Sequence, residues 1–388
     1  MRILYIQASW VPPTENLQAD RFFLLSENLE GDVLQPVWFE RPRQVEEEFG
    51  SGAYPQYSRG RFHYHWFLSW RYGRWRRHLA TQWFYLRKGL EIHRKNRYDC
   101  IVAYSHMTPA LTAVLLKLLT GAKLIVEIAT APDLSYLHEH QRRTLRDRLM
   151  RVFSDFSLHL SVLLSDRVHL LYRTQLAHYP LLRRVPASVF HEFVPMSLIH
   201  PAEGDGERVA LCVGSPWYPK GVDLLIEAFR SVGAEFPDVT LRIQGYNPDS
   251  AKVEALAAGI PRIEIVKAAP YPQTLRRISR ALLLVLPTRC EGMGRVLIEA
   301  MGARVPVIGS DAGGVPHYVL QGENGLVFPA GNVDELAGRL RELLANEELR
   351  RRLGSKGYEL AHTLYTERAY VDQFTSMVEA AVRGGNVR

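Results

Sequence analysis

Residues 284–301 read LVLPTRCEGMGRVLIEAM, and the fold is decided by this stretch. The apolar run that ends at Pro287 predicts a buried strand, and a helix is expected to begin near Gly292. Glycines at the start of a helix let a ligand approach the backbone, and the N–H groups of the first turn have no partners within the helix. Because that end of a helix favours negative charge, the stretch predicts an α/β unit with a site for a diphosphate.

Two acidic residues lie on either side of the start of this helix, eight residues apart. Glu291 precedes the helix and Glu299 lies two turns along it. At a rise of about 1.5 Å per residue, their backbones are roughly 10 Å apart along the axis. This distance matches the span from a sugar, across two phosphates, to a ribose. Carboxylates accept hydrogen bonds from vicinal hydroxyls, so the two acids are suited to the two ends of a nucleotide diphosphate-sugar.

The rest of the second half alternates between continuous apolar runs and helical patterns. Runs of this kind between helices are typical of parallel sheets covered on both faces. Strands are predicted over residues 209–213, 240–244, 263–266, 282–286, 305–308 and 326–328. Helices are predicted over residues 222–232, 271–280, 294–301, 332–344 and 347–364.

The first half has the same alternation in a less regular form. Strands are predicted over residues 3–7, 33–39, 101–105, 124–129 and 168–172. The polar segment 201–207 is typical of a linker, so we expect domains over residues 1–200 and 201–365. Open parallel sheets bind ligands beyond the carboxyl ends of their strands, and two such domains are expected to face a cleft. A last helix within residues 366–388 is expected to cross back to the first domain.

Composition agrees with two domains and excludes several classes of protein. At 388 residues, 47% of them apolar, the chain can bury two cores. The three cysteines, Cys100, Cys212 and Cys290, lack metal-ligand spacing and indicate a reducing cytoplasm. No apolar run reaches the roughly 18 residues of a membrane span, and the first residues do not resemble a signal peptide.

Several motifs occur together with the two acids. PVIGSDAGGVP follows at 306–316 and NGLV at 324–327, while KGVDLLIEAF stands upstream at 220–229, after Gly214. With the E-x7-E spacing of Glu291 and Glu299, residues 208–345 resemble glycosyltransferase family 4. That family is retaining and has the GT-B fold, in which two Rossmann-like, doubly wound parallel-sheet domains face a cleft.

The resemblance implies roles for individual residues. The residue that matches Lys220 contacts the diphosphate, that matching Glu299 holds the ribose, and that matching Glu291 faces the donor sugar. Catalytic roles are therefore predicted for Glu291 and Lys220. Nucleotide contacts are predicted for Gly214, Ser215, Gly292, Met293, Gly294, Arg295 and Glu299. No metal and no resident cofactor are expected, since the nucleotide diphosphate-sugar is the donor substrate.

Some positions depart from the family pattern. Ser215 stands where the family usually has Arg; Arg295 is either its replacement or a solvent-facing helix residue. The first loop, residues 9–18, has no glycine, and no histidine follows the strand at 124–129. Glu127 and Asp133 are candidates for the acceptor side, with core packing and loop capping as the alternatives. His106, at the end of a predicted strand, is a third candidate for contact with substrate.

A basic and aromatic stretch distinguishes the first half. Residues 59–97 contain nine Arg and two Lys against one Glu, and four of the seven Trp. Residues 79–90 fit an amphipathic crossover helix. The part from Phe62 to Trp75 predicts a peripheral membrane contact, or binding of an anionic glycan or lipid diphosphate acceptor. No motif supports nucleic acid as a partner.

The sequence therefore predicts a retaining, metal-independent hexosyltransferase with a glycan or lipid-linked acceptor. A role in cell-surface polysaccharide or glycolipid synthesis, in the cytoplasm at the inner face of the cell membrane, fits this hypothesis. One alternative is a non-catalytic scaffold that binds a nucleotide-sugar at the membrane. Another is a different GT-B class, such as a sugar-nucleotide epimerase, or a phosphorylase, for which no phosphate or cofactor site is found.

Overall fold

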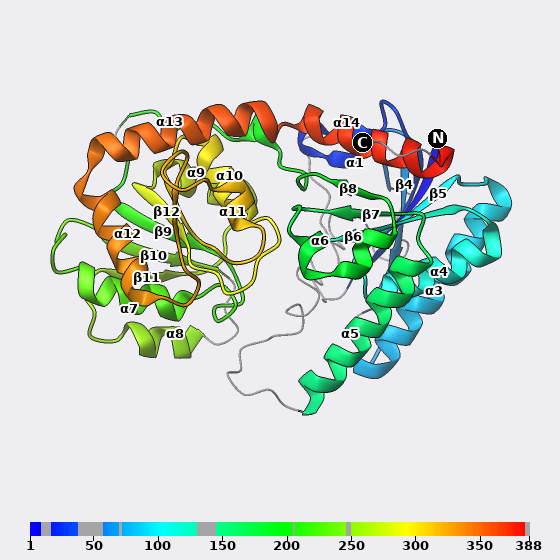
Figure 1. Ribbon diagram of the computed structural model, residues 1–388, viewed down its shortest axis with the longest axis horizontal. Coiled ribbons are helices and arrows are strands. Elements are labelled where there is room, and N and C mark those ends of the chain that lie inside the picture. Colours follow the sequence, from blue (N-terminus) through cyan, green and yellow to red (C-terminus); the bar gives the residue numbers. More distant parts are fainter. Residues whose placement is uncertain are drawn as a thin grey trace. The chain divides into compact units, whose positions relative to one another are not determined.

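The computed structural model describes residues 1–8, 17–37, 57–69, 72–129, 145–204, 206–245 and 250–384. The chain forms two compact units (Figure 1). The first comprises Met1–Asp133, Leu149–Phe190 and Tyr370–Arg388, and the second comprises Leu134–Arg148 and His191–Ala369. The C-terminal segment from Tyr370 is thus part of the first unit.

The sequence places the domain boundary after residue 200, but in the structure the second unit already includes residues from His191 onward. The backbone N–H of Glu192 donates to Met293 Sδ at 3.3 Å. Met196 lies so close to Gly302 that a Cβ there would be 2.6 Å from its sulfur. Residues 191–199 therefore pack on the second unit, because its helices provide their apolar contacts.

The first unit is built on an eight-stranded sheet with the order β3-β4-β2-β1-β5-β6-β7-β8. All neighbouring strands are parallel except β3 and β4, which are antiparallel. The strands are β1 (Arg2–Ile6), β2 (Glu30–Pro36), β3 (Tyr57–Arg59), β4 (Phe62–Phe67), β5 (Cys100–Tyr104), β6 (Lys123–Ile128), β7 (Arg167–Leu170) and β8 (Ala187–Val189).

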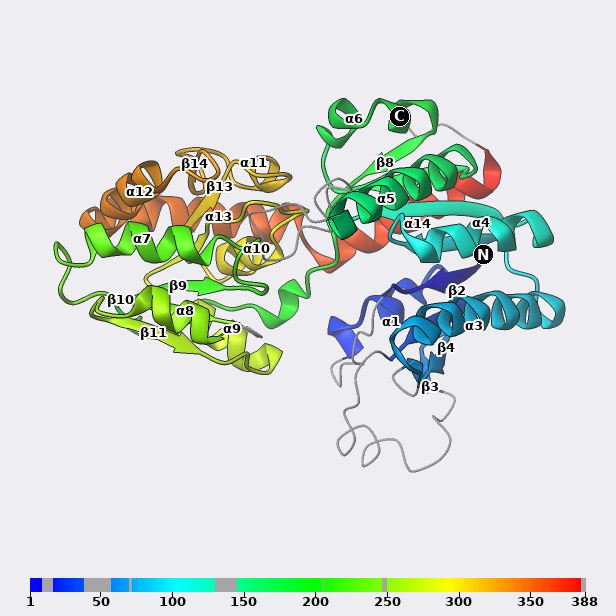
Figure 2. The ribbon, with the colours of Figure 1, turned by 90° about the horizontal axis from the view of Figure 1, so that it is seen from below.

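Helices cover both faces of this sheet. On one face α3 (Arg74–Lys95), α4 (Thr108–Thr120) and α5 (Leu145–Leu163) share an apolar core with the strands (Figure 2). On the other face lie α1 (Arg21–Leu25) and α14 (Glu367–Arg383), whose Phe22 and Phe374 contact the ring of Tyr5 in β1. The short helix α6 (Gln175–His178) follows β7. Because both faces are covered, a central strand such as β5 is apolar along its whole length, whereas β2 and β4 also carry polar residues.

The segment predicted to face a membrane is partly a core strand. Residues Phe62–Phe67 form β4, in which Phe62 is fully buried and Tyr64 nearly so. Both rings pack on Phe22, at centroid distances of 5.3 and 5.7 Å. The prediction was wrong for this strand, because its alternate side chains point into the core. Trp70 and Arg71 lie outside the described residues.

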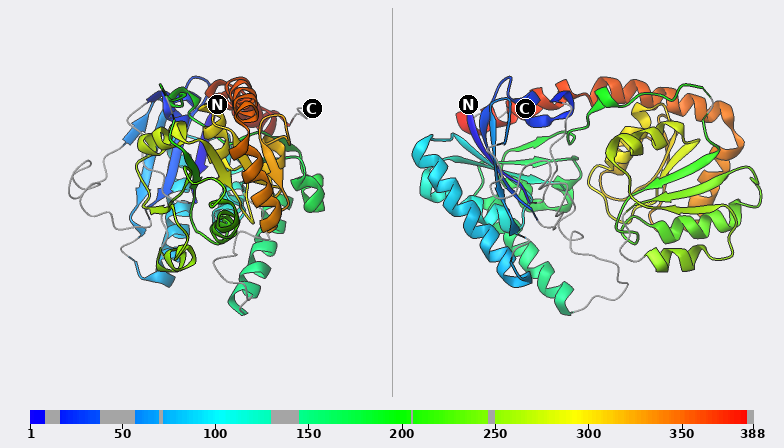
Figure 3. Two further views of the ribbon diagram at one scale, coloured as in Figure 1. Left: turned by 90° about the vertical axis from the view of Figure 1, so that its left-hand side faces the viewer. Right: turned by 180° about the vertical axis from the view of Figure 1, so that it is seen from behind.

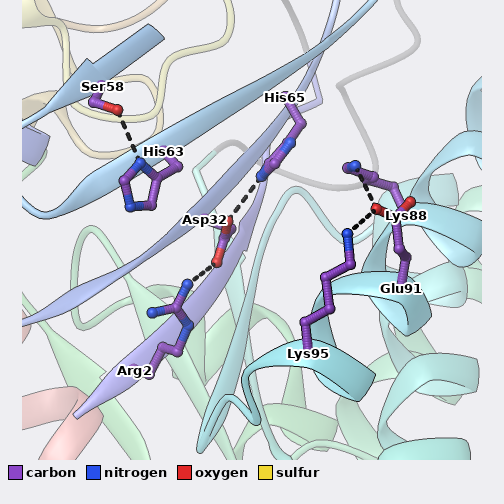
Figure 4. Close-up of polar contacts among 8 residues, drawn as sticks. All are labelled: Arg2, Asp32, Ser58, His63, His65, Lys88, Glu91 and Lys95. Carbon is purple, nitrogen blue, oxygen red and sulfur yellow. Dashed lines mark hydrogen bonds and ion pairs between the residues drawn. The ribbon is translucent and has the colours of Figure 1, made fainter. Parts of the chain in front are cut away.

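A polar cluster in this sheet shows how the register places side chains (Figure 4). Asp32 in β2 is opposite Leu4 in β1 and His63 in β4. Arg2 lies two positions from Leu4, and His65 lies two positions from His63, so both point to the same face of the sheet as Asp32. Their side chains contact the Asp32 carboxylate at 2.6 and 2.8 Å. Burial alone would raise the pKa of Asp32, but the hydrogen bond from His65 and the Arg2 guanidinium lower it.

The second unit has a six-stranded, fully parallel sheet with the order β11-β10-β9-β12-β13-β14. The strands are β9 (Val209–Val213), β10 (Thr240–Gln244), β11 (Ile263–Val266), β12 (Leu283–Leu286), β13 (Val307–Ser310) and β14 (Leu326–Phe328). The helices are α7 (Val222–Val232), α8 (Ser250–Ala257), α9 (Tyr271–Arg280), α10 (Arg295–Gly302), α11 (Val315–Tyr318), α12 (Val333–Ala345) and α13 (Glu347–Leu364) (Figure 3).

Local sequence explains where several of these elements begin. The side chain of Asn332 accepts from the backbone of Glu335 at 3.1 Å and caps α12. Asn346 caps α13 in the same way through Leu349, at 2.9 Å. Such side chains satisfy N–H groups that a helix leaves free at its start. The predicted bounds of β9, β10, β11 and β14 agree with the structure.

Candidate functional site

Three loops meet at the carboxyl edge of the second sheet. They follow the adjacent strands β9, β12 and β13 and comprise residues 214–221, 287–294 and 311–314. The backbone N–H of Arg289 donates to the Pro219 carbonyl at 2.8 Å, and that of Gly314 donates to the Glu291 carbonyl at 3.3 Å. The middle loop is therefore held from both sides.

Two glycines make this close approach of the loops possible. Gly221 and Gly313 have φ angles of +67° and +58°, a region that other residues rarely adopt. A Cβ on Gly221 would lie 1.9 Å from the carbonyl oxygen of Pro287. A Cβ on Gly313 would lie 2.0 Å from the carbonyl oxygen of Glu291. Any larger residue at either position would push the loops apart.

Arg289 fastens the first two loops, and the sequence analysis missed it. Its guanidinium donates to both carboxylate oxygens of Asp223 at 2.7 Å, and to the Tyr218 carbonyl at 2.7 Å. It also stacks over the Tyr218 ring, 4.2 Å from the centroid. Bidentate pairs of this kind fix geometry as well as adding energy. Asp223 belongs to the KGVD motif, but nothing in the sequence indicates which cation it binds.

Lys220 and Glu291, both predicted as catalytic, contact each other. Lys220 Nζ lies 2.5 Å from Glu291 Oε2, and the side chains are 22% and 14% exposed. The other carboxylate oxygen accepts from the backbone N–H of Gly292 at 3.1 Å. A Cβ on Gly214 would lie 3.1 Å from Cγ of Lys220, so the absence of a side chain there leaves room for the lysine. Ser215, next in the chain, is exposed.

Glu299 lies two turns along α10 and is buried. Its Oε1 accepts from the Tyr271 hydroxyl at 3.0 Å and from the Arg295 guanidinium at 3.3 Å. The Arg295 side chain is 44% exposed, so its charge is next to Glu299 yet open to solvent. Burial and the nearby Glu299 carboxylate raise the pKa of Tyr271. The sequence gave no signal for Tyr271, which comes from the start of a different helix.

Helix α10 begins later than its glycine-rich sequence predicts. The helix begins at Arg295 rather than near Gly292, and Gly294 precedes it with a φ of +74°. Gly292 and Gly294 are both buried. Met293 is only 2% exposed, and its sulfur accepts from the backbone N–H of residue 192, so its side chain is part of the packing.

His106 does not have the environment predicted for a substrate contact. Its ring is 2% exposed, and its Nε2 lies 2.9 Å from Ser154 Oγ in α5. The Ser157 hydroxyl donates to the His106 carbonyl at 2.6 Å. Burial lowers the pKa of His106 to about 4. The structure therefore gives this neutral histidine a packing role, because α5 covers the end of β5.

Glu127 is also part of a core. Its carboxylate accepts from the Tyr5 hydroxyl and faces His169 Nδ1 at 2.7 Å. His169 Nε2 in turn faces the Phe190 carbonyl at 3.1 Å. Burial raises the pKa of Glu127, but the His169 contact and the charge of Arg21 outweigh it, and the pKa is lowered. Of the other candidates, Asp133 and residues 9–16 lie outside the described residues.

In the described ranges, no three His, Cys, Asp or Glu side chains gather as a metal-binding group. No helix in the same part of the chain combines the length and apolar character that crossing a membrane requires. Cys100 and Cys212 are buried and Cys290 is half-buried, all three as free thiols.

Comparison with known proteins identifies the segment that carries these loops. Residues 200–360 match the family described as Glycosyl transferases group 1. A glycosyltransferase of Methanocaldococcus jannaschii is 32% identical over 161 residues, covering 41% of this chain and 44% of the relative. A lipopolysaccharide core biosynthesis mannosyltransferase of Rhizobium leguminosarum is 28% identical, with 42% and 51% covered. The match is confined to residues 200–360, and over these residues it supports the resemblance to family 4.

Solved structures match over almost the whole chain. Sucrose-phosphate synthase from Thermosynechococcus elongatus has a TM-score of 0.78 at 18% identity, covering 99% of this chain and 100% of that one. Anabaena Alr3699/HepE in complex with UDP has a TM-score of 0.69 at 16% identity, with 98% and 100% covered. These likenesses establish the GT-B fold. The chain spans about half the length of the curated relatives it matches.

Proposed function

We propose that the protein transfers a sugar from a nucleotide diphosphate-sugar to a glycan or lipid-linked acceptor, with retention at the anomeric carbon. The observation that carries this proposal is the Lys220–Glu291 pair, 2.5 Å apart where three loops meet. The pair is partly exposed, so a ligand can reach it. It also lies in the segment that matches the glycosyl transferases group 1 family.

Lys220 is assigned to the diphosphate. When the sugar leaves, negative charge builds up on the phosphate oxygens, and a fixed ammonium stabilises it most in the transition state. The N-terminus of α10 adds a positive field at the same edge of the sheet. We therefore propose that the reaction requires no divalent metal.

Glu291 is assigned to the donor sugar. Without a donor, its carboxylate balances the charge of Lys220. A bound diphosphate replaces the carboxylate as partner of the ammonium, and Glu291 then accepts from sugar hydroxyls. A direct contact between the two residues is consistent with this exchange, because both groups reach the same point.

Glu299 is assigned to the ribose. Tyr271 and Arg295 hold its Oε1, and we assign Oε2 to the ribose hydroxyls. The two bonds fix the carboxylate before the nucleotide binds, which lowers the entropy lost on binding. We also propose that Arg295, whose side chain on the first turn of α10 is 44% exposed, supplies the cation that Ser215 does not.

Retention is proposed to occur without a protein nucleophile. The acceptor oxygen attacks the anomeric carbon on the face from which the diphosphate departs. The bond from that carbon to the phosphate oxygen breaks, the new glycosidic bond forms, and the acceptor proton passes to the leaving phosphate. Lys220 stabilises the same oxygen, so both events occur beside it.

The name of one relative supports the proposed class of acceptor. One relative is named for lipopolysaccharide core biosynthesis, which supports a glycan or lipid-linked acceptor in cell-surface polysaccharide or glycolipid synthesis. We propose that the protein acts in the cytoplasm, at the inner face of the cell membrane. The solved Anabaena protein holds UDP, so UDP-sugars are the first donors to test.

The test is release of nucleoside diphosphate from a panel of nucleotide-sugars, with and without acceptors, in the presence of EDTA. Enzyme-dependent release, with an acceptor product of the same anomeric configuration as the donor, supports the proposal. Tight nucleotide binding without any turnover would favour the scaffold, and recovery of an epimerised sugar would favour the epimerase. If release of nucleoside diphosphate strictly required a divalent ion, only the metal-free mechanism would be contradicted, and the assignment as a glycosyltransferase would stand.

A further inference from the structure

The first unit leaves large apolar side chains exposed on the helices of one face. Leu79 and Trp83 in α3 are 74% and 64% exposed. In α5, Leu149, Val152 and Phe156 are 62%, 67% and 58% exposed. Single exposed apolar residues are common on protein surfaces, but a set of this size on neighbouring helices is not.

These side chains follow the helical period. Five exposed apolar residues of α5 occur in steps of four, three, four and seven, at 145, 149, 152, 156 and 163, and Met150 beside them is 37% exposed. Leu158 and Val162 of the same helix lie in the core. Residues spaced in this way share one side of a helix, so α5 has a buried apolar stripe and a second, outward one.

The outward side of α3 combines apolar and basic residues. Arg76, Leu79, Trp83, Arg87 and Arg94 are all exposed, at steps of three, four, four and seven. Tyr85 and Ile92 of the same helix lie in the core. The predicted crossover helix is therefore present, but one of its sides faces solvent.

The three helices lie side by side. Figures 1 and 3 show α3, α4 and α5 next to one another on the same face of the sheet. The Lys117 ammonium in α4 donates to the Leu164 carbonyl, just after α5, at 2.8 Å. Leu115, Leu118 and Leu119 of α4 are also exposed. We call the outward side chains of these helices the α3–α5 face.

The charge of this face is strongly positive. Helix α3 carries seven Lys and Arg against a single acid, Glu91. Lys88 and Lys95 hold that acid at 3.0 and 3.2 Å (Figure 4). The exposed arginines of the outward stripe are therefore not matched by acidic residues of their own helix.

We propose that the α3–α5 face docks on an anionic membrane surface. Trp and Leu between Arg residues suit a headgroup interface, where rings and methyls enter the apolar boundary and guanidinium groups bind lipid phosphates. A second copy of the chain fits this face less well, because a two-fold contact would oppose positive charge to positive charge. The docking does not depend on the donor chemistry proposed above.

Co-sedimentation of the full chain with vesicles tests this proposal. The vesicles contain phosphatidylcholine alone, or equal parts of phosphatidylcholine and phosphatidylglycerol. Binding to the anionic vesicles should fall with added salt but persist in part, since salt screens only the electrostatic contribution. The Arg76→Gln/Arg87→Gln variant should bind about 25-fold more weakly, since each basic residue near the surface contributes about fivefold. Val152→Ser/Phe156→Ser should remove the part that survives salt.

The matched control is Arg351→Gln/Lys356→Gln, which removes two exposed cations from α13 of the second unit. It should bind vesicles as the unaltered protein does. All three variants should keep a cooperative unfolding transition in urea, which tryptophan fluorescence reports for the first unit, and should keep nucleotide binding by the second unit. Equal losses in both charge variants would mean attraction by net charge and would overturn the proposal. Absence of binding to anionic vesicles, with a dimer that Val152→Ser/Phe156→Ser dissociates, would assign the face to a second copy.

Discussion

Two ion pairs, one in each unit, join a carboxylate to a nitrogen at a similar distance but in different surroundings. Lys220 and Glu291 are 2.5 Å apart on loops and partly exposed, whereas His169 and Glu127 are 2.7 Å apart on strands and 3–4% exposed. Both members of the buried pair have a further protein partner. The Tyr5 hydroxyl donates to Glu127, and the Phe190 carbonyl faces Nε2 of His169. The exposed pair can exchange its partner for a ligand, while the buried pair can only hold the fold. For these two pairs, exposure to solvent rather than residue type separates the candidate site from the structural contact.

The largest effect should come from breaking the buried pair. Glu127→Ala leaves His169 and the Tyr5 hydroxyl without their partner, and should lower the free energy of unfolding by about 3–5 kcal/mol. Six of the seven tryptophans lie within residues 1–133, so tryptophan fluorescence in urea reports mainly on the first unit. Glu291→Ala, which breaks a partly exposed pair in the second unit, should cost only about 0–1 kcal/mol. Far-UV circular dichroism in urea, which reports on the helices of both units, measures this second loss. Equal losses in the two variants would refute the comparison.

The same pair predicts how stability depends on pH. An unfolded Glu has a pKa of about 4.3, and in the folded chain the pKa of Glu127 is lower. Its contribution is therefore complete above about pH 4.3 and is lost as the pH falls through the folded value. Urea unfolding of the first unit, repeated over this range, should show a shallower pH dependence in Glu127→Gln. An unchanged slope would mean that the folded carboxyl titrates normally.

Next in size is the effect of removing the exposed cation. Lys220→Ala should lower kcat of glycosyl transfer by about 10²–10³-fold, the range found when one charge-stabilising donor is lost. The donor KM should change less, because charge develops mainly in the transition state. Lys356→Ala, on the surface of α13, is the control. A loss confined to KM would assign Lys220 to uniform binding instead.

A smaller effect is expected at the far end of the donor. Glu299→Ala should weaken nucleotide binding by about 1.5–3 kcal/mol, the scale of a hydrogen bond to a charged group. Isothermal titration with UDP measures this directly. Unchanged affinity in a folded variant would remove Glu299 from the ribose site.

The smallest effect tests the support of that carboxylate. Tyr271→Phe removes only the hydroxyl that donates to Glu299 and should cost about 0.5–1.5 kcal/mol of nucleotide affinity. In the Glu299→Ala background the same change should have almost no effect, because Tyr271 acts through Glu299. A full additional loss in the double variant would show that Tyr271 contacts the nucleotide itself.

The amino-acid sequence alone determined most of the second unit and its motifs. Apolar runs such as residues 209–213 and 326–328 can only be buried strands between helices, so their bounds were predictable. The placement of Glu299 on α10 was predictable from the helical pattern, whereas Glu291 lies in the loop before this helix, which begins at Arg295. These features depend on residues that are near each other in the chain.

Only the tertiary structure decided which distant side chains meet and which remain exposed. Lys220 and Glu291 are 71 residues apart, and Glu127 and His169 are 42 apart; strand order alone brings each pair together. His106 resembled a strand-end ligand until α5 covered it, and Phe62 resembled a membrane anchor until β4 placed it against Phe22. Conversely, Leu149 and Phe156 of α5 remain outside the core. The sequence specifies the period of each element, but burial depends on what packs against it.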